Sequence, residues 1–264
     1  MTKIAIFSVA LLSLVALSCS EFTLTPSPGS GQGELRLYLI DSPAAYDEVN
    51  ISVARVEVHK ESFDSTAGWY VINDVPATYN LLELRNGASA ILGGAKLQPG
   101  KYTQIRLILA DGSNIKLGGV TYPLTVPSGF QTGVKLNHEF MIESGKLYEL
   151  MLDFDAERSV RYQGNRYRMS PVIRVHAVVT SGSISGTIDP PSAKAYAFTV
   201  VGSDTVSTVA DTLTGFFRLM ALPEGTYTLE ITSLAGTHND TPITGVGVVK
   251  QIDTDLGVIP LSLK

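Results

Sequence analysis

Six side chains suited to metal binding or ion pairing stand at alternate positions of three apolar stretches. They are Glu57, His59, Asp153, Asp155, Arg174 and His176. The alternation predicts strands that bury one face and expose the other. Carboxylates beside a histidine can bind a divalent ion, as a metal-assisted hydrolase would require. The six can meet on one outer sheet face only if the three strands are neighbours. Otherwise they form solvated, salt-bridged surfaces.

Beyond these six, the sequence lacks the motifs of the common enzyme classes. It has no phosphate-binding glycine loop, no Gly-x-Ser-x-Gly turn and no HExxH motif, and its four histidines stand far apart. His138 alternates with Leu136 and Phe140, so we expect a buried, hydrogen-bonded imidazole rather than a ligand. The sequence favours a protein that is not an enzyme and needs no cofactor, with the metal-assisted hydrolase as the alternative.

Arginine and tyrosine residues give a second candidate site. The stretch 161–168, RYQGNRYR, connects two predicted strands. In it Tyr162, Arg166 and Tyr167 offer flat faces and hydrogen-bond donors of the kind that binding surfaces use. The same stretch also fits a plain hairpin with a Gly-Asn tip and tyrosines packed across the strand pair. Both interpretations stay open at this point.

We expect short β-strands to position these residues. Apolar and polar residues alternate along most of the chain, and Gly, Pro, Asn and Asp separate the alternating runs. The expected strands are 34–41, 49–60, 68–73, 79–84, 101–110, 113–117, 120–125, 134–142, 147–155 and 171–179. Only 86–92 favours a helical turn.

A second series of strands follows the polar stretch 180–183. They are expected at 183–188, 194–201, 205–211, 215–219, 226–232, 244–250 and 257–262. This length suits a small β-sandwich. We therefore expect an all-β fold with two β-sandwich-like domains, at 34–180 and 181–264, after a lipoprotein signal and a flexible tether.

The N-terminal stretch contains the chain's single cysteine, Cys19, after an apolar run from Ile4 to Leu17. That run is shorter than the roughly 20 residues that span a bilayer, but it fits the core of a secretory signal. The segment Ala16-Leu17-Ser18-Cys19 resembles the lipobox of bacterial lipoproteins, although leucine is commoner at the first of these positions and a small residue at the second. The resemblance implies cleavage of residues 1–18 and lipidation of Cys19. An ordinary signal with an incidental cysteine is the alternative.

The residues around this cysteine predict an exported, anchored protein. Two or three acyl chains would hold it durably on a membrane. Ser20 after the cysteine implies sorting to the outer membrane or cell surface, and the Pro/Ser/Gly-rich remainder of 19–33 predicts a tether.

Charge and composition limit the partners. The formal net charge is −5 and the sequence contains no run of basic residues. Nucleic acid is therefore not expected as a partner, because binding its phosphates needs clustered Lys and Arg. A single, lipidated cysteine leaves no thiol for disulfides or thiol catalysis. The partners that we expect are the membrane, through the lipid anchor, and a polysaccharide or an envelope protein.

The first predicted domain resembles a known family. Separated segments over roughly 33–178 are similar to the bacterial domain-of-unknown-function family 4382. They are Leu39-Ile40-Asp41-Ser42-Pro43, Val56-Glu57-Val58-His59-Lys60, Leu84-Arg85-Asn86-Gly87, Gly100-Lys101-Tyr102-Thr103-Gln104-Ile105-Arg106 and Leu152-Asp153-Phe154-Asp155. The family's members are typically exported lipoproteins. The resemblance implies no enzymatic activity.

The second predicted domain resembles carboxypeptidase regulatory-like and transthyretin-like modules over roughly 182–264. The strand 215–219, GFFRL, and the turn 222–227, LPEGTY, carry this resemblance. It implies a small β-sandwich that serves as a spacer, a stabiliser or a ligand platform. The expected protein is thus lipid-anchored at the cell envelope, with a non-catalytic binding or structural role.

Overall fold

The computed structural model describes residues 31–61, 68–126 and 133–264, and nearly all of its regular elements are strands. The all-β prediction is confirmed. Cys19, the expected signal at 1–18 and most of the expected tether lie outside the described residues. No helix within the described ranges combines the length and the apolar character needed to cross a membrane.

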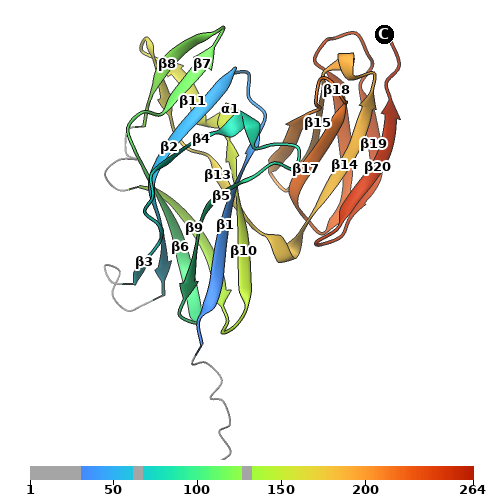
Figure 1. The fold of residues 1–264 in the computed structure, drawn as a ribbon. Helices are drawn as coiled ribbons and strands as arrows, with labels where there is room; N and C mark the ends of the chain where they lie inside the picture. Colours follow the sequence, from blue (N-terminus) through green and yellow to red (C-terminus); the bar gives the residue numbers. More distant parts are fainter. Residues whose placement is uncertain (1–30, 62–67, 127–132) are drawn as a thin grey trace, which may run out of the picture.

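Two sheets form the first sandwich (Figure 1). Its strands are β1 (Gly33–Ser42), β2 (Glu48–Lys60), β3 (Trp69–Asn73), β4 (Ala77–Asn80), β5 (Ala90–Leu97), β6 (Gly100–Leu109), β7 (Asn114–Leu117), β8 (Val120–Thr125), β9 (Val134–Ile142), β10 (Leu147–Asp155), β11 (Val160–Gln163), β12 (Arg166–Met169) and β13 (Ile173–Ala177). One sheet has the order β13-β10-β1-β5. The other runs β11-β12-β8-β7-β2-β6-β9, with β3 and β4 also paired to β2.

The core of the first sandwich lies between these sheets. In β1, Leu35, Leu37 and Leu39 are fully buried at alternate positions, as a half-covered strand requires. They belong to one hydrophobic cluster with Val56 and Val58 of β2, which lies in the other sheet. The outer faces of the two sheets therefore point away from each other.

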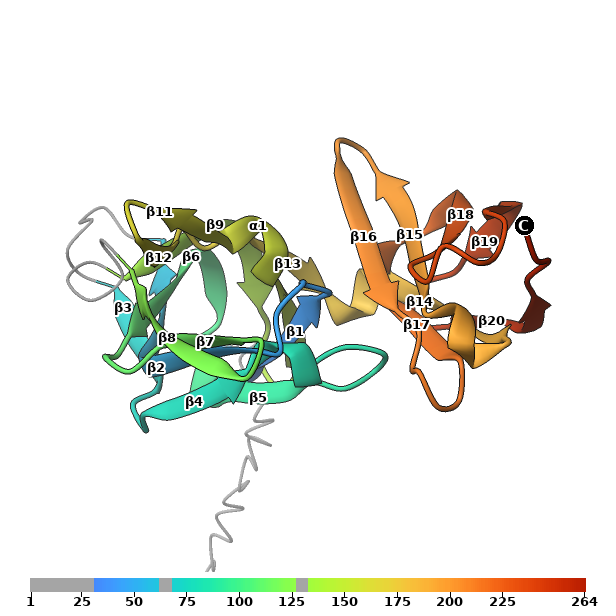
Figure 2. The same ribbon diagram turned by 90° about the horizontal axis from the view of Figure 1, so that it is seen from above.

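A second, smaller sandwich follows, with its own hydrophobic cluster. Its strands are β14 (Ser181–Asp189), β15 (Ala195–Val201), β16 (Asp204–Val209), β17 (Phe216–Pro223), β18 (Gly225–Ser233), β19 (Thr241–Val248) and β20 (Asp253–Pro260). They form sheets of order β17-β14-β20 and β16-β15-β18-β19. Figure 2 shows this sandwich beside the first.

The few helical elements are one turn long. They are η1 (Leu81–Glu83), α1 (Ala156–Ser159), η2 (Val178–Thr180) and η3 (Pro191–Ala193). The expected helical turn at 86–92 is wrong, since a turn at 86 and 87 is followed by β5. The alternation is hidden there because Gly93 and Gly94 interrupt it. The predicted domain division at 180 and 181 stays a prediction, and η2 precedes that position.

Candidate functional site

The six residues predicted to share an outer face lie in two different sheets. Glu57 and His59 are on β2 in the sheet of nine strands. The other four are on β10 and β13, which pair with each other in the sheet of four. The predicted convergence is wrong, because the shared core separates the two groups. Within the described ranges, no three His, Cys, Asp or Glu side chains form a group that could hold a metal ion.

Glu57 belongs to a packed ion-pair network instead of an open site. Its side chain is only 6% exposed, and its carboxylate accepts from Arg106 Nε at 2.8 Å and pairs with Arg55 Nε at 2.9 Å. The Arg106 guanidinium lies 3.8 Å from the centroid of the Trp69 ring, and the His59 ring packs on the same indole with centroids 5.0 Å apart. The expectation that Glu57 points to solvent is thus wrong, because two arginines cover it.

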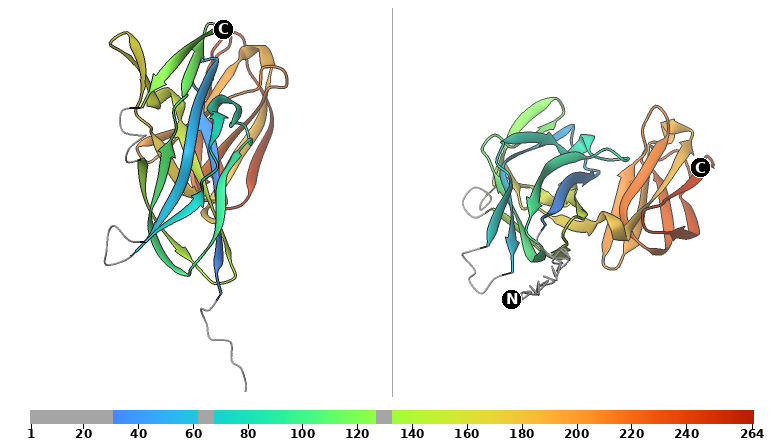
Figure 3. Two further views of the ribbon diagram at one scale, coloured as in Figure 1. Left: turned by 60° about the vertical axis from the view of Figure 1, so that its left-hand side comes forward. Right: turned by 60° about the horizontal axis from the view of Figure 1, so that its bottom comes forward.

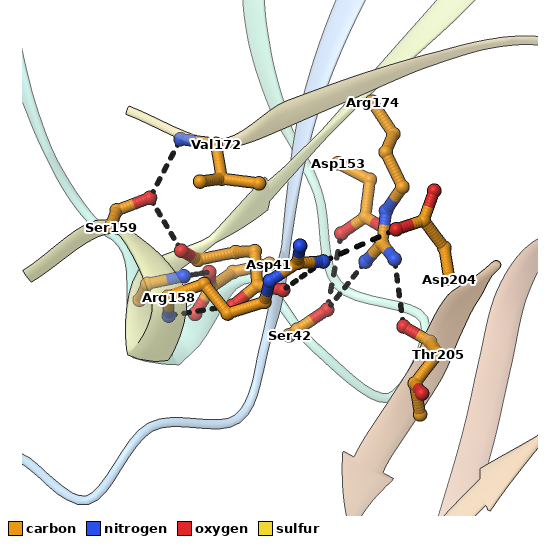
Figure 4. A network of polar contacts seen from close by, with 11 residues as sticks. Asp41, Ser42, Asp153, Arg158, Ser159, Val172, Arg174, Asp204 and Thr205 are labelled. Atoms are coloured by element: carbon orange, nitrogen blue, oxygen red, sulfur yellow. Dashed lines mark hydrogen bonds and ion pairs between the residues drawn. The ribbon is translucent and has the colours of Figure 1, made fainter. Parts of the chain in front are cut away.

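Asp153 and Arg174 form a buried ion pair between the two sandwiches (Figure 4). Arg174 Nη2 lies 2.7 Å from Asp153 Oδ2, and Arg174 Nε donates to the same oxygen at 3.1 Å. Arg174 Nη2 also donates to Ser42 Oγ at 3.2 Å, and Nη1 donates to the Thr205 carbonyl of the second sandwich at 2.7 Å. Burial raises the pKa of Asp153, and Arg174 opposes that shift. This arginine therefore joins the sandwiches rather than facing a ligand.

Asp155 is also buried, and it caps a helical turn. Its Oδ1 accepts from the Arg158 backbone N–H at 2.9 Å, which is the bond an N-cap makes. Arg158 Nη1 in turn pairs with Asp204 of β16 at 3.2 Å (Figure 4). The expected outward position of Asp153 and Asp155 is corrected in one respect: they do point away from the first core, but the second sandwich covers them.

Asp41 is a buried acid that the sequence did not single out as a site residue. It is 6% exposed; its Oδ1 accepts from the Ala156 N–H at 3.1 Å, and its Oδ2 is without a hydrogen-bond partner in the described structure. Burial raises the pKa of Asp41 well above its usual range. The adjoining cavity, about 20 Å³ and also lined by Arg85 and Arg218, has room for about one water molecule.

Asn86 extends from the first sandwich into the second. Its Nδ2 donates to the Val209 carbonyl at 2.9 Å, and its Oδ1 accepts from Thr208 Oγ1 at 2.6 Å and from the Arg218 N–H at 3.2 Å. Asn86 has a φ of 55°, a left-handed conformation that asparagine tolerates well. Its segment LRNG carried part of the family resemblance, and that is the signal that pointed to this position.

Two histidines line a pocket of about 370 Å³ near the junction. His176 has its pKa lowered to about 4, first by burial and then by the nearby Arg174 charge. Burial also lowers the pKa of His138, whose ring stacks on Phe140 with centroids 6.3 Å apart. Both Nε2 atoms are buried without a hydrogen-bond partner in the described ranges, so the hydrogen bond expected for His138 is not found at this atom.

The predicted binding loop is the β11–β12 hairpin, which projects at one end of the first sandwich (Figures 1 and 3). Tyr162 and Tyr167 are cross-strand partners with ring centroids 5.0 Å apart. Tyr122 of β8 adds a third ring 5.2 Å from Tyr167. Tyr167 packs against the core, whereas Tyr162 is 63% exposed.

Both interpretations of this segment therefore hold in part. It is a hairpin, with Gly164 and Asn165 in left-handed conformations at its tip, and Arg166 beside them is exposed. It also presents an exposed tyrosine and a supporting tyrosine cluster. Such an arrangement can stack on a flat ligand and donate hydrogen bonds.

Comparison with known proteins identifies the first sandwich. The family model described as "Domain of unknown function (DUF4382)" matches residues 32–171. No curated protein matches the chain.

Solved structures give distant likenesses. The chain is similar to the TIE protein of Bacillus anthracis, at 13% identity and a TM-score of 0.26 over 88% of this chain and 34% of that one. It thus spans about a third of that protein. The minor pilin GBS52 of Streptococcus agalactiae is 10% identical, with a TM-score of 0.26 over 87% of this chain and 96% of the pilin. A putative adhesin of Bacteroides ovatus is 11% identical, with a TM-score of 0.26 over 89% of this chain and 94% of the adhesin. These scores are too low to carry a function over to this chain.

Proposed function

The chain belongs to the DUF4382 family, whose model matches residues 32–171, and from that premise we propose that it is a lipid-anchored envelope protein that binds a partner without catalysis. One observation carries the binding role. The β11–β12 hairpin and β8 lie at the end of the first sandwich opposite to the end where β1 begins (Figure 1).

This placement gives the anchor and the hairpin separate tasks. A chain held through Cys19 would be fixed at the end where β1 begins, with the tether 19–33 between membrane and fold. The exposed Tyr162 and the arginines around it would then face away from that membrane, at the outer membrane or cell surface. Tyrosine and arginine are the residue types that supply much of the binding energy at interfaces.

The second sandwich has a supporting role in this proposal. We assign 181–264 as a domain of the carboxypeptidase regulatory-like type, docked on the first domain, 34–180. Its contacts with Asn86, in the turn before β5, and with Arg174 of β13 fix it against the first sandwich. It would hold the first domain in one orientation rather than bind the partner itself.

The metal-assisted hydrolase is not retained as the proposed function. Its six residues divide between two sheets, and several are already engaged in short ion pairs. A binding role, by contrast, needs only the exposed hairpin that the structure has.

The anchor is tested by phase partitioning of the full chain expressed in a bacterial host. We expect the wild-type protein in the detergent phase and the Cys19→Ser variant in the aqueous phase, because only the thiol can carry the diacylglycerol. A wild-type chain that retains residues 1–18, or that partitions into water, would contradict the anchor.

The binding role is tested by recovery of partners from envelope extracts on the immobilised, non-lipidated chain. Tyr162→Ser should reduce recovery several-fold, because it removes the most exposed ring of the cluster. Tyr196→Ser is the control, since Tyr196 lies on β15 of the second sandwich and packs beside Phe198 rather than in the tyrosine cluster of the hairpin. Equal recovery by both variants and the wild type would contradict a role for the hairpin.

A further inference from the structure

We infer that the outer face of the β11–β12 hairpin, with the hollow beside β8, binds an acidic polysaccharide through Arg161, Arg166 and Arg168. This inference rests on the proposed binding function and names the class of its ligand.

The strand register places these arginines on one side of the hairpin. Arg161 lies directly opposite Arg168, and Gln163 lies opposite Arg166. Because side chains alternate along a strand, these positions face one way and the tyrosines face the other. The tyrosine side continues the core-facing side of the sheet, since Tyr167 packs on the core. The arginines are therefore on its outer face.

The positive charge of this face has no counterpart that would explain it as a feature of folding. Among the described residues, none of the three arginines is in an ion pair, although the whole chain has a net charge of −5. Like charges directly opposite each other in a strand pair destabilise the pair. The Arg161–Arg168 pair is thus a local cost to stability, and a bound anion would remove it.

A hollow continues this face along the sheet. β12 pairs with β8 so that Arg168 lies beside Thr125. Thr125 is one of the residues lining a hollow of about 480 Å³, together with Thr121, Ser113 and Asn114. Hydroxyl and amide groups suit the hydroxyls of a sugar, and the forked guanidinium groups suit a carboxylate or sulfate. Asp111 also lines the hollow, and its negative charge partly offsets the positive charge of the arginines.

The position of the face selects among polyanions. An anionic lipid surface is disfavoured, because the hairpin lies at the end opposite to the start of β1 (Figure 1). Three arginines beside Asp111 also make no continuous basic stripe of the kind that tracks a nucleic acid backbone. A polymer of acidic sugars matches both halves of the site, its charges at the arginines and its hydroxyls in the hollow.

The test measures binding of polygalacturonate, of neutral dextran and of vesicles of anionic phospholipid to the full chain carrying Cys19→Ser. We expect polygalacturonate to bind, and the triple variant Arg161→Gln, Arg166→Gln, Arg168→Gln to bind about tenfold more weakly or worse. Raising the salt from about 0.05 M to about 0.5 M should weaken wild-type binding several-fold, because the charges are exposed. Asp111→Asn should strengthen it.

Two controls separate binding from folding. Arg36→Gln changes a half-exposed arginine that pairs with Glu34 on the first sandwich, and it should leave binding unchanged. The triple variant should unfold at the same temperature as the wild type or a higher one, because it removes the cross-strand repulsion.

Several outcomes would overturn the inference while leaving the proposed function to its own test. They are equal binding of dextran and polygalacturonate, binding only to vesicles of anionic phospholipid, and no binding to either polymer. Partner recovery that Tyr162→Ser reduces and the triple arginine variant does not would likewise assign the binding to the tyrosine side alone.

Discussion

At the scale of single residues, Arg174 bonds through all three nitrogens of its guanidinium, to an aspartate, a serine and a backbone carbonyl. A buried charge is tolerated only when it is paired and hydrogen-bonded in this way. Its partner Asp153 looks solvent-exposed in the sequence because strand alternation reports only which side of a sheet a residue is on. The second sandwich, which begins at Ser181, covers that side.

His176 gives a pH-dependent prediction. The pKa of this imidazole falls from 6.5 to about 4 on folding, so the unfolded chain binds the proton more readily. The stabilising contribution of neutral His176 is therefore complete above pH 6.5 and is lost as the pH falls toward 4. The shift corresponds to roughly 3 kcal/mol of unfolding free energy.

Denaturant unfolding measured between pH 4 and pH 7 checks this prediction. His176→Gln should flatten the fall in unfolding free energy toward acid pH. His138→Gln should flatten it less, because the pKa of His138 is lowered by burial alone. An unchanged slope in the His176 variant would show that the imidazole titrates normally in the folded protein.

At the scale of elements, the turn before β17 depends on a glycine. Gly215 has a φ of 77°, and a Cβ there would clash with the Ile188 carbonyl of β14. Gly202 has a similar φ of 63° in the β15–β16 turn, with nothing near the place a Cβ would take. Comparing substitutions at these two glycines therefore distinguishes the cost of a left-handed backbone from the cost of a steric clash.

Thermal and denaturant unfolding of Gly215→Ala and Gly202→Ala checks this assignment. Both should lose about 1 kcal/mol from the left-handed conformation. Gly215→Ala should lose at least about 2 kcal/mol more, because the backbone of β14 must move. Equal losses in the two variants would mean that β14 accommodates the added methyl group.

Alternation was sufficient to predict most strands and the all-β class. β1, β2 and β10 carry regular apolar periods, and the structure has strands there. β5 was missed because two glycines interrupt its period. Of the candidate site, the hairpin was one of the two open interpretations of 161–168, and the structure has it because the Gly-Asn turn signal is local. The convergence of Glu57 with Asp153 was wrong because sheet membership depends on pairing between distant segments, which local periodicity does not encode.

At the scale of the whole molecule, the two sandwiches are joined by specific polar contacts. Asn86 alone makes three hydrogen bonds to the second sandwich. Removing it leaves the Val209 carbonyl and the Arg218 N–H without this partner, at a cost of roughly 1–3 kcal/mol. We expect Asn86→Ala to loosen the docking while each sandwich stays folded.

Hydrogen exchange measured by mass spectrometry checks this expectation. Peptides covering 205–209 and 84–88 should lose protection in Asn86→Ala, whereas core strands such as β6 and β18 should not. Asn137→Ala is the control, because it removes an exposed amide whose side-chain hydrogen bond among the described residues is to Gln104. Unchanged protection at the junction would mean that the Arg174 and Arg158 contacts suffice to hold it.

The pairing of β1 has a consequence for the order in which the polypeptide acquires its shape. Leu37, near the start, lies beside Leu150 in a parallel ladder, and Ile188 at the start of the second body likewise lies beside Ile259. Neither body can close until a late strand has arrived, and such distant pairings form slowly. A polypeptide of this topology would stay extended until those late strands are made, which suits the export proposed for this chain.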